Sequence, residues 1–164
     1  MLDLTDEQKM ARKLLRQWAD KELAPNVATL APGTLLPSEL MRKLVAAFGM
    51  DEMVRGLFKK LEEKDGNKER GIGDPGLMAI VSMELSRVCP GFCLAFGASL
   101  GLAGGAIMSK GTLAQKQKWA LPILTMEKIG AWGMTEPGAG SDAFGSMRTT
   151  ARRDGGHFVL NGQK

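Results

Sequence analysis

The chain has 164 residues, 44% of them apolar and 24% charged, a composition that is typical of a globular domain and excludes a disordered chain. Its 22 basic and 18 acidic residues give a net charge of +4, but the two signs are mixed along the chain, which argues against a nucleic-acid-binding surface. The two cysteines, Cys89 and Cys93, are too few for a disulfide scaffold and lack the further ligands of a zinc site. We expect them to be small buried thiols.

The first predicted helix begins at Thr5, because Thr5 and Gln8 have the spacing of a capping box. Apolar residues follow it at helical spacing: Met10, Leu14, Leu15, Trp18 and Leu23. We expect this helix to end at Ala24, since Pro25 disfavours helical conformation in the residue before it. A second helix is predicted from Pro37 to Gly49, with an apolar face formed by Leu40, Met41, Leu44, Val45 and Phe48.

The segment from Asp51 to Arg70 is rich in charge and predicts a short exposed helix, followed by a loop around residues 65–67. We interpret it as a solvated surface insertion. The next strong helix is predicted from Pro75 to Val88.

The longest apolar stretch, residues 88–108, holds no charged residue and is long enough to span a bilayer. It contains five glycines and one proline, so we expect a buried core helix instead. Within it Phe92, Phe96 and Leu100 form one stripe, and a second stripe has only small residues: Cys93, Gly97 and Gly101. Small residues either permit close packing or leave room for a ligand, and both interpretations stay open.

Gly111 and Thr112 predict a helix stop and a new N-cap, with a short helix over residues 113–120 before Pro122. After Pro122 the pattern changes: residues 129–135 are strand-like, and residues 147–153 and 157–160 predict two strands joined across a hairpin turn at residues 154–156. An isolated hairpin is marginally stable, so we expect the chain to be part of a longer protein.

Between these strands, residues 135–142 form a loop rich in small residues. Its glycines permit positive φ, and the hydroxyls of Thr135 and Ser141 can donate to phosphate or carbonyl oxygens. It has neither the ending of a P-loop nor the spacing of a Rossmann fingerprint. A tight turn and a cradle for an anionic cofactor are equally compatible with it. His157 has no nucleophile arrangement around it and is predicted to lie on a strand face.

Residues 132–142, Trp-Gly-Met-Thr-Glu-Pro-Gly-Ala-Gly-Ser-Asp, resemble the signature segment of the flavin-dependent acyl-CoA dehydrogenases. The similarity extends over nearly the whole chain, and is weakest between Asp51 and Gly73. Further similar segments are residues 4–8, 21–25, 83–87, 111–122 and 158–164. The family's helix at residues 83–87 usually carries paired glutamates, whereas only Glu84 stands here.

The resemblance implies a mainly α fold, with a helical N-terminal domain over residues 1–128 and the start of a middle β domain, truncated in this chain, over residues 129–164. It implies FAD-dependent α,β-dehydrogenation of an acyl-CoA thioester to the enoyl-CoA, in which a glutamate base takes the α proton and the flavin takes a hydride. No catalytic residue is assigned within the chain, and neither Glu84 nor Glu136 is taken as the base. No metal is expected.

By the same resemblance, FAD would be contacted by Trp132, Gly133, Met134, Thr135, Gly140 and Ser141. The acyl-CoA substrate would be contacted by Ser141, Cys93, Phe96, Gly97 and Leu100. A glycine at position 97 would leave room for a bulky or long acyl group.

The resemblance further implies an electron-transfer flavoprotein or similar acceptor as partner, a homo-oligomer (dimer or tetramer) in the full-length enzyme, and a place in fatty acid metabolism. The acidic, helix-like start of the chain is unlike a targeting peptide, so we expect a cytoplasmic protein. Two alternatives stay open: a flavin oxidase of the same superfamily, and a non-catalytic module that binds acyl-CoA or a partner subunit. We expect the 164 residues alone to be inactive and to retain FAD weakly or not at all.

Overall fold

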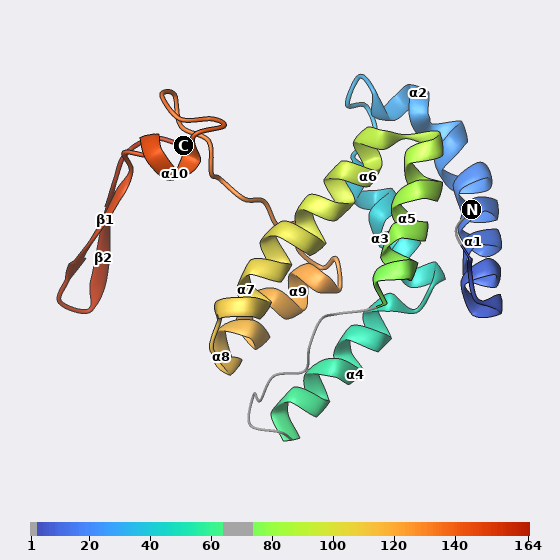
Figure 1. Ribbon diagram of the computed structural model, residues 1–164, viewed down its shortest axis with the longest axis horizontal. Helices are drawn as coiled ribbons and strands as arrows, with labels where there is room; N and C mark the ends of the chain where they lie inside the picture. Colours follow the sequence, from blue (N-terminus) through green and yellow to red (C-terminus); the bar gives the residue numbers. More distant parts are fainter. Residues whose placement is uncertain (1–2, 64–73) are drawn as a thin grey trace. The chain divides into compact units, whose positions relative to one another are not determined.

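The computed structural model describes residues 3–63 and 74–164, and the chain divides into two compact units, Met1–Ala131 and Trp132–Lys164. The first unit is helical and the second holds the hairpin (Figure 1). The mainly α fold with β structure at its end is therefore confirmed. The predicted loop around residues 65–67 lies outside the described residues.

The helical unit begins with α1, which is followed by a π-helical turn, a 3-10 turn and the further helices (Figure 1). In chain order the segments are α1 (Asp6–Trp18), η1 (Ala19–Leu23), η2 (Ala24–Asn26), α2 (Val27–Leu30), α3 (Pro37–Ala47), α4 (Met50–Glu63), α5 (Pro75–Val88), α6 (Pro90–Gly97), η3 (Ala98–Gly104), α7 (Gly105–Lys110), α8 (Leu113–Gln115), η4 (Lys116–Ala120) and α9 (Leu121–Leu124).

The capping box at the start of α1 is confirmed: Thr5 Oγ1 accepts from the Gln8 backbone N–H, and Gln8 Oε1 accepts from that of Thr5. The predicted end at Ala24 is wrong, because helical structure continues through η1, η2 and α2 to Leu30. Pro25 lies in the first turn of η2, where a missing backbone N–H costs no hydrogen bond.

The second predicted helix is confirmed as α3, in which Leu40, Met41, Leu44 and Val45 are buried. The chain turns at Gly49, whose φ of 59° lies in the left-handed region that favours glycine.

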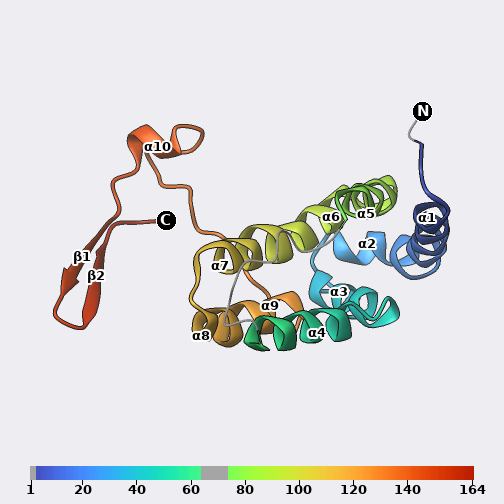
Figure 2. The ribbon, with the colours of Figure 1, turned by 60° about the horizontal axis from the view of Figure 1, so that its bottom comes forward.

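The interpretation of residues 51–70 as an exposed insertion is wrong for the described part. Helix α4 buries Val54, Phe58 and Leu61, and Val54 and Phe58 pack against Leu124 in a small second core. Figure 2 shows α4 lying beside α9, to which it is packed. The charged residues occupy its other face, as is usual for an amphipathic helix.

Pro122 likewise does not end a helix, since it stands in the first turn of α9. The predicted N-cap before this region is confirmed, because Thr112 forms a second capping box with Gln115.

Segments α6, η3 and α7 form one continuous helix, Pro90–Lys110. Among the described residues it is the one helix whose length and composition would allow it to cross a membrane. Only 22% of its apolar window is buried. The buried stripe consists of Phe92, Phe96, Ser99 and Ala103, at helical spacing. The helix thus contributes one face to the core, which is less than the fully buried helix that the sequence predicted.

Close packing occurs on this buried face rather than at the predicted stripe of Cys93, Gly97 and Gly101. Ser99 Oγ accepts a hydrogen bond from the Gly130 N–H at 2.9 Å. A Cβ placed on Gly130 would lie 2.6 Å from the Ala103 Cβ, so only glycine permits this approach.

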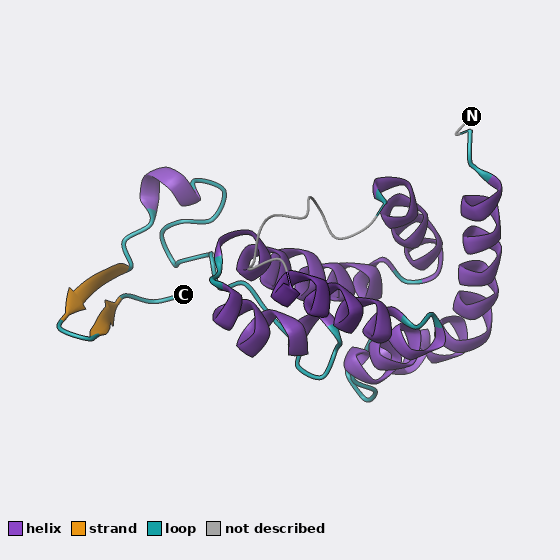
Figure 3. Ribbon diagram, turned by 90° about the horizontal axis from the view of Figure 1, so that it is seen from below, coloured by secondary structure: helices purple, strands orange, loops and turns teal. Residues whose placement is uncertain are grey.

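The second unit contains a short helix, α10 (Ala143–Ser146), and an antiparallel hairpin of β1 (Thr150–Asp154) and β2 (His157–Asn161), seen in orange in Figure 3. The predicted hairpin is confirmed. Its register pairs Thr150 with Asn161 and Asp154 with His157, and Gly155 in the turn has a φ of 57°.

The first of its strands begins at Thr150, later than predicted. The strand expected over residues 129–135 is wrong, because no described segment pairs with it. An extended segment becomes a strand only when a neighbour supplies the ladder of hydrogen bonds.

We expect Gly130→Ala to lower the free energy of unfolding by about 1 to 3 kcal/mol, since the added methyl would overpack the contact with Ala103. Urea denaturation followed by circular dichroism measures this. The matched control is Gly56→Ala in α4, where nothing lies within 4 Å of the added Cβ and a gain of about 0.5 to 1 kcal/mol is expected. Equal effects of the two substitutions would contradict the argument.

Candidate functional site

The signature segment, defined as residues 132–142, contains a tight turn. Glu136 and Ala139 exchange backbone hydrogen bonds, 2.9 Å from the Glu136 N to the Ala139 O and 3.1 Å from the Ala139 N to the Glu136 O. Pro137 and Gly138 form the exposed tip between them. Of the two interpretations that the sequence left open, the structure therefore shows the tight turn.

A buried carboxylate holds this turn to the beginning of the hairpin. Glu136 is 8% exposed, and it accepts hydrogen bonds from the backbone N–H of Arg148 at 2.7 Å and of Thr149 at 3.1 Å. The Lys164 ammonium lies 3.0 Å from its Oε1. The backbone donor at Arg148 contributes most to lowering the pKa of Glu136, which falls to about 2.

Lys164 also holds the segment that precedes the turn. Its Nζ donates to the Met134 carbonyl oxygen at 2.8 Å and contacts the Met147 sulfur at 3.0 Å. Sequence reasoning missed this role. The only signal was that residues 158–164 belong to the similarity with the family.

The end of the signature segment is held by Asp142, which caps α10. Its side chain accepts from the Gly145 N–H at 3.1 Å and from the Ser146 hydroxyl. Gly140 and Ser141, just before this cap, are exposed. Their polar groups are thus accessible on a loop that is fixed at both ends.

The predicted FAD contacts Trp132 to Thr135 are also accessible. Trp132 is 55% exposed and Met134 42% exposed. The backbone N–H groups of Gly133, Met134 and Thr135 donate to no acceptor among the described residues. This stretch therefore offers apolar surface and free N–H donors side by side.

The predicted acyl-group contacts divide between two faces of the long helix. Gly97 is exposed, with nothing within 4 Å of a Cβ placed on it, and Cys93 and Leu100 are half-buried. Phe96 is 5% exposed and belongs to the main core, so it does not share the open face with Gly97. The expectation that both cysteines are buried is wrong, because Cys89 is half-buried as well.

Glu84 occupies a second buried carboxylate site, on α5. It is 1% exposed and receives hydrogen bonds from Arg12 Nε at 2.8 Å, Arg16 Nε at 2.9 Å and Arg87 Nε at 3.3 Å. Burial alone would raise the pKa of Glu84, but the hydrogen bonds from Arg16 and Arg12 outweigh it and lower the pKa to about 2.

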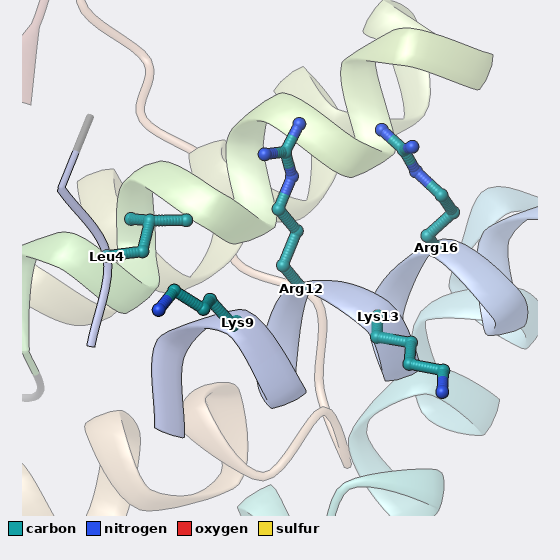
Figure 4. Close-up of a pocket in the computed structure, with 5 residues that line it drawn as sticks. All are labelled: Leu4, Lys9, Arg12, Lys13 and Arg16. Atoms are coloured by element: carbon teal, nitrogen blue, oxygen red, sulfur yellow. The ribbon is translucent and has the colours of Figure 1, made fainter. Parts of the chain in front are cut away.

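Two of the arginines that hold Glu84, Arg12 and Arg16, also line a depression of about 330 Å³ beside α1. Figure 4 shows the guanidinium groups of Arg12 and Arg16 extended toward α5, whereas the side chains of Lys9 and Lys13 point elsewhere. The arginine charges in this depression are therefore directed at Glu84, and we assign the cluster to the packing of α1 on α5.

Glu84 and Glu136 thus both act as structural anchors, each joining two segments of the chain. The carboxylate oxygens of each are engaged by donors, and a carboxylate with a pKa of about 2 is a weak proton acceptor near neutral pH. Within residues 3–63 and 74–164, no three His, Cys, Asp or Glu side chains are grouped so that they could hold a metal ion.

The helical unit is followed along the chain by a glycine-rich loop that hydrogen bonds from Glu136 and Asp142 anchor within the second unit. Residues 5–127 match the family model of the acyl-CoA dehydrogenase N-terminal domain. The chain therefore belongs to the acyl-CoA dehydrogenase family, and the resemblance noted from its sequence is confirmed.

Named relatives agree. A short-chain specific acyl-CoA dehydrogenase of Clostridium acetobutylicum is 35% identical over 99% of this chain and 40% of its own length. The CarC subunit of the caffeyl-CoA reductase-Etf complex of Acetobacterium woodii is 35% identical over 98% of this chain and 40% of its own length. The chain thus spans about 40% of the length of these relatives.

Among solved structures, a glutaryl-CoA dehydrogenase from Mycobacterium smegmatis in complex with FADH2 has a TM-score of 0.73 and 29% identity. The match covers 97% of this chain and 38% of that one.

We expect Glu84→Gln to lower the free energy of unfolding by about 3 kcal/mol, because it removes the buried negative charge that pairs with Arg12 and Arg16 and is shared with Arg87, which also pairs with Asp20. Denaturation with urea at pH 7 measures this. The matched substitution Glu52→Gln, at an exposed position, should change stability by less than about 0.5 kcal/mol. A loss no larger at Glu84 than at Glu52 would contradict the assignment.

The pH dependence of stability follows from the same carboxylate. Its pKa of about 2 in the folded protein lies below the ordinary value of 4.5, so its stabilisation is fully present above pH 4.5 and is lost as the pH falls toward 2. We expect the free energy of unfolding to decline across this window, and to decline less in Glu84→Gln. Thermal unfolding at a series of pH values tests it, and identical profiles for both proteins would count against the ion cluster.

Proposed function

We propose that this chain contributes residues to the site in which an acyl-CoA thioester undergoes FAD-dependent α,β-dehydrogenation to the enoyl-CoA. The observation that carries the proposal is the anchored segment Trp132–Thr135, where exposed large side chains lie beside backbone N–H groups that have no protein acceptor among the described residues. Membership of the acyl-CoA dehydrogenase family supports it.

The residues of this segment fit an isoalloxazine ring. A flat aromatic ring needs apolar contact on its face and donors for its carbonyl oxygens and ring nitrogens at its edge. Met134 and Trp132 offer the first, and the Thr135 hydroxyl and N–H offer the second. Bound FAD would supply the two-electron acceptor that removal of hydrogen from the acyl Cα and Cβ requires.

For the acyl-CoA itself, two groups of residues are proposed. The Ser141 hydroxyl, exposed before the cap of α10, would donate to the CoA portion. The open face of the long helix at Gly97, with half-buried Cys93 and Leu100 beside it, would line the cavity for the acyl group. Because Phe96 is buried in the core, it would contribute less of the cavity lining than Gly97, Cys93 and Leu100.

The proton at the acyl α carbon requires a base that is free to accept it. Glu84 and Glu136 do not qualify, because arginines, a lysine and backbone N–H groups already occupy their oxygens. We therefore place the base on a residue other than these two.

We further propose that an electron-transfer flavoprotein reoxidises the reduced flavin and that the enzyme is a homo-oligomer. The relative from Acetobacterium woodii, named as a subunit of an Etf complex, supports the first point.

The test uses a protein of the relatives' full length that carries this chain. We expect it to be purified with bound FAD, visible in its absorption spectrum, and to oxidise members of a panel of acyl-CoA thioesters when an artificial electron acceptor is present under nitrogen. The panel, ranging from short to long and branched acyl groups, also defines the substrate.

Two outcomes would contradict this proposal. Turnover with dioxygen as efficient as with the acceptor would identify a flavin oxidase. Acyl-CoA binding without FAD and without turnover would identify a non-catalytic module.

A further inference from the structure

The position of Lys164 is determined by the turn that follows β2. Gly162 has a φ of 148°, and a Cβ placed on it would lie 2.6 Å from the Thr149 Cα. This close approach, which only glycine permits, brings the chain back across the beginning of β1, so that Lys164 reaches residues 134 and 136.

All three N–H groups of the Lys164 ammonium have neighbours within the second unit. Nζ lies 2.8 Å from the Met134 carbonyl oxygen, 3.0 Å from Glu136 Oε1 and 3.0 Å from the Met147 sulfur. The lysine side chain is 33% exposed and the Glu136 side chain 5% exposed, so the ion pair is largely shielded from water. Such charge-assisted hydrogen bonds are stronger than those between neutral groups.

The bond to Met134 fixes the orientation of one particular peptide group. A trans peptide is planar, with its C=O and N–H pointing in opposite directions, and the described chain has no cis peptide. Because the Met134 carbonyl points to Lys164, the N–H of Thr135 points away from Lys164. That N–H has no acceptor among the described residues.

The hairpin does not need this bond. The β1–β2 ladder has its own register, and Glu136 is already held by the backbone N–H groups of Arg148 and Thr149. The Lys164 contact adds control of the peptide between residues 134 and 135, which lies in the stretch proposed to contact FAD.

We propose that Lys164, itself held by Glu136, is a positioning residue that presents the Thr135 N–H to the flavin. The inference rests on the proposed function only in taking the ligand to be FAD. The orientation of the peptide is independent of the ligand.

The first experiment tests this orientation in the 164-residue chain without flavin. Nuclear magnetic resonance of protein labelled with 13C at the Met134 carbonyl and 15N at the Thr135 amide compares Lys164→Met with the wild type. We expect both signals to shift in Lys164→Met and to stay near their wild-type positions in Lys164→Arg, which keeps a charged donor. Unchanged signals in Lys164→Met would overturn the inference.

The second experiment uses the flavin-loaded protein of full length. We expect Lys164→Met to weaken FAD binding about tenfold, the loss of roughly one hydrogen bond, and to shift the flavin absorption bands. We expect kcat to fall while KM for the acyl-CoA stays within about twofold, because the lysine is not among the residues proposed to contact the substrate. Lys164→Arg should recover most of the affinity.

The control is Arg152→Met, which removes a positive charge from an exposed position of the same hairpin. It should leave FAD affinity and spectrum unchanged. Equal FAD affinity in Lys164→Met and wild type, or an equal loss in Arg152→Met, would overturn the inference. A wild type that binds no FAD would instead refute the proposed function, and the resonance experiment would still decide the peptide orientation.

Discussion

The structure depends on one constraint, which is that the long helix Pro90–Lys110 must admit another stretch of backbone on one face. Ser99 satisfies the N–H of Gly130 there, and Gly130 lies so close to Ala103 that no side chain fits. This contact fixes the backbone just before the signature segment. On the other side of the helix nothing lies within 4 Å of a Cβ placed on Gly97 or Gly101, so close packing and open surface occur on the same helix.

Two buried carboxylates solve the same physical problem in different ways. An ionised carboxylate out of water is costly unless donors surround it. Glu84 takes its donors from arginine side chains on α1 and α5 and so joins two helices. Glu136 takes them from backbone N–H groups and Lys164, and so joins a turn to a hairpin. In both cases the full set of donors that makes burial tolerable also removes the carboxylate from acid–base chemistry.

The features that the sequence predicted correctly are those that neighbouring residues determine. The capping box at Thr5, the N-cap at Thr112, the helix end at Gly49 and the hairpin turn at Gly155 each depend on a few adjacent residues, and the structure confirms them. The predictions that failed depended on residues far along the chain, or on where in a helix a proline stands. Helix α4 is buried because α9, far along the chain, covers it. Pro25 and Pro122 stand in first turns, where proline is compatible with a helix.

The candidate site shows the same division. The signature segment could be recognised from its sequence, and the glycines and hydroxyls that suggested a ligand are on an anchored, accessible loop. The anchors themselves could not be found in this way, because the pairing of Lys164 with Glu136 joins residues on either side of the hairpin. The face on which Phe96 lies follows from the packing of the whole helical unit.

The exposure of Trp132 has a practical consequence for optical work on this protein. The chain has three tryptophans and no tyrosine, so fluorescence excited at the long-wavelength edge of the aromatic absorption comes from indole alone. Trp18 lies against Phe92 in the helical unit, with the two rings tilted, and Trp119 lies beside Lys118, which leaves Trp132 as the sole tryptophan of the second unit. With the first two replaced by phenylalanine, fluorescence would report the environment of the signature segment directly, without any added label.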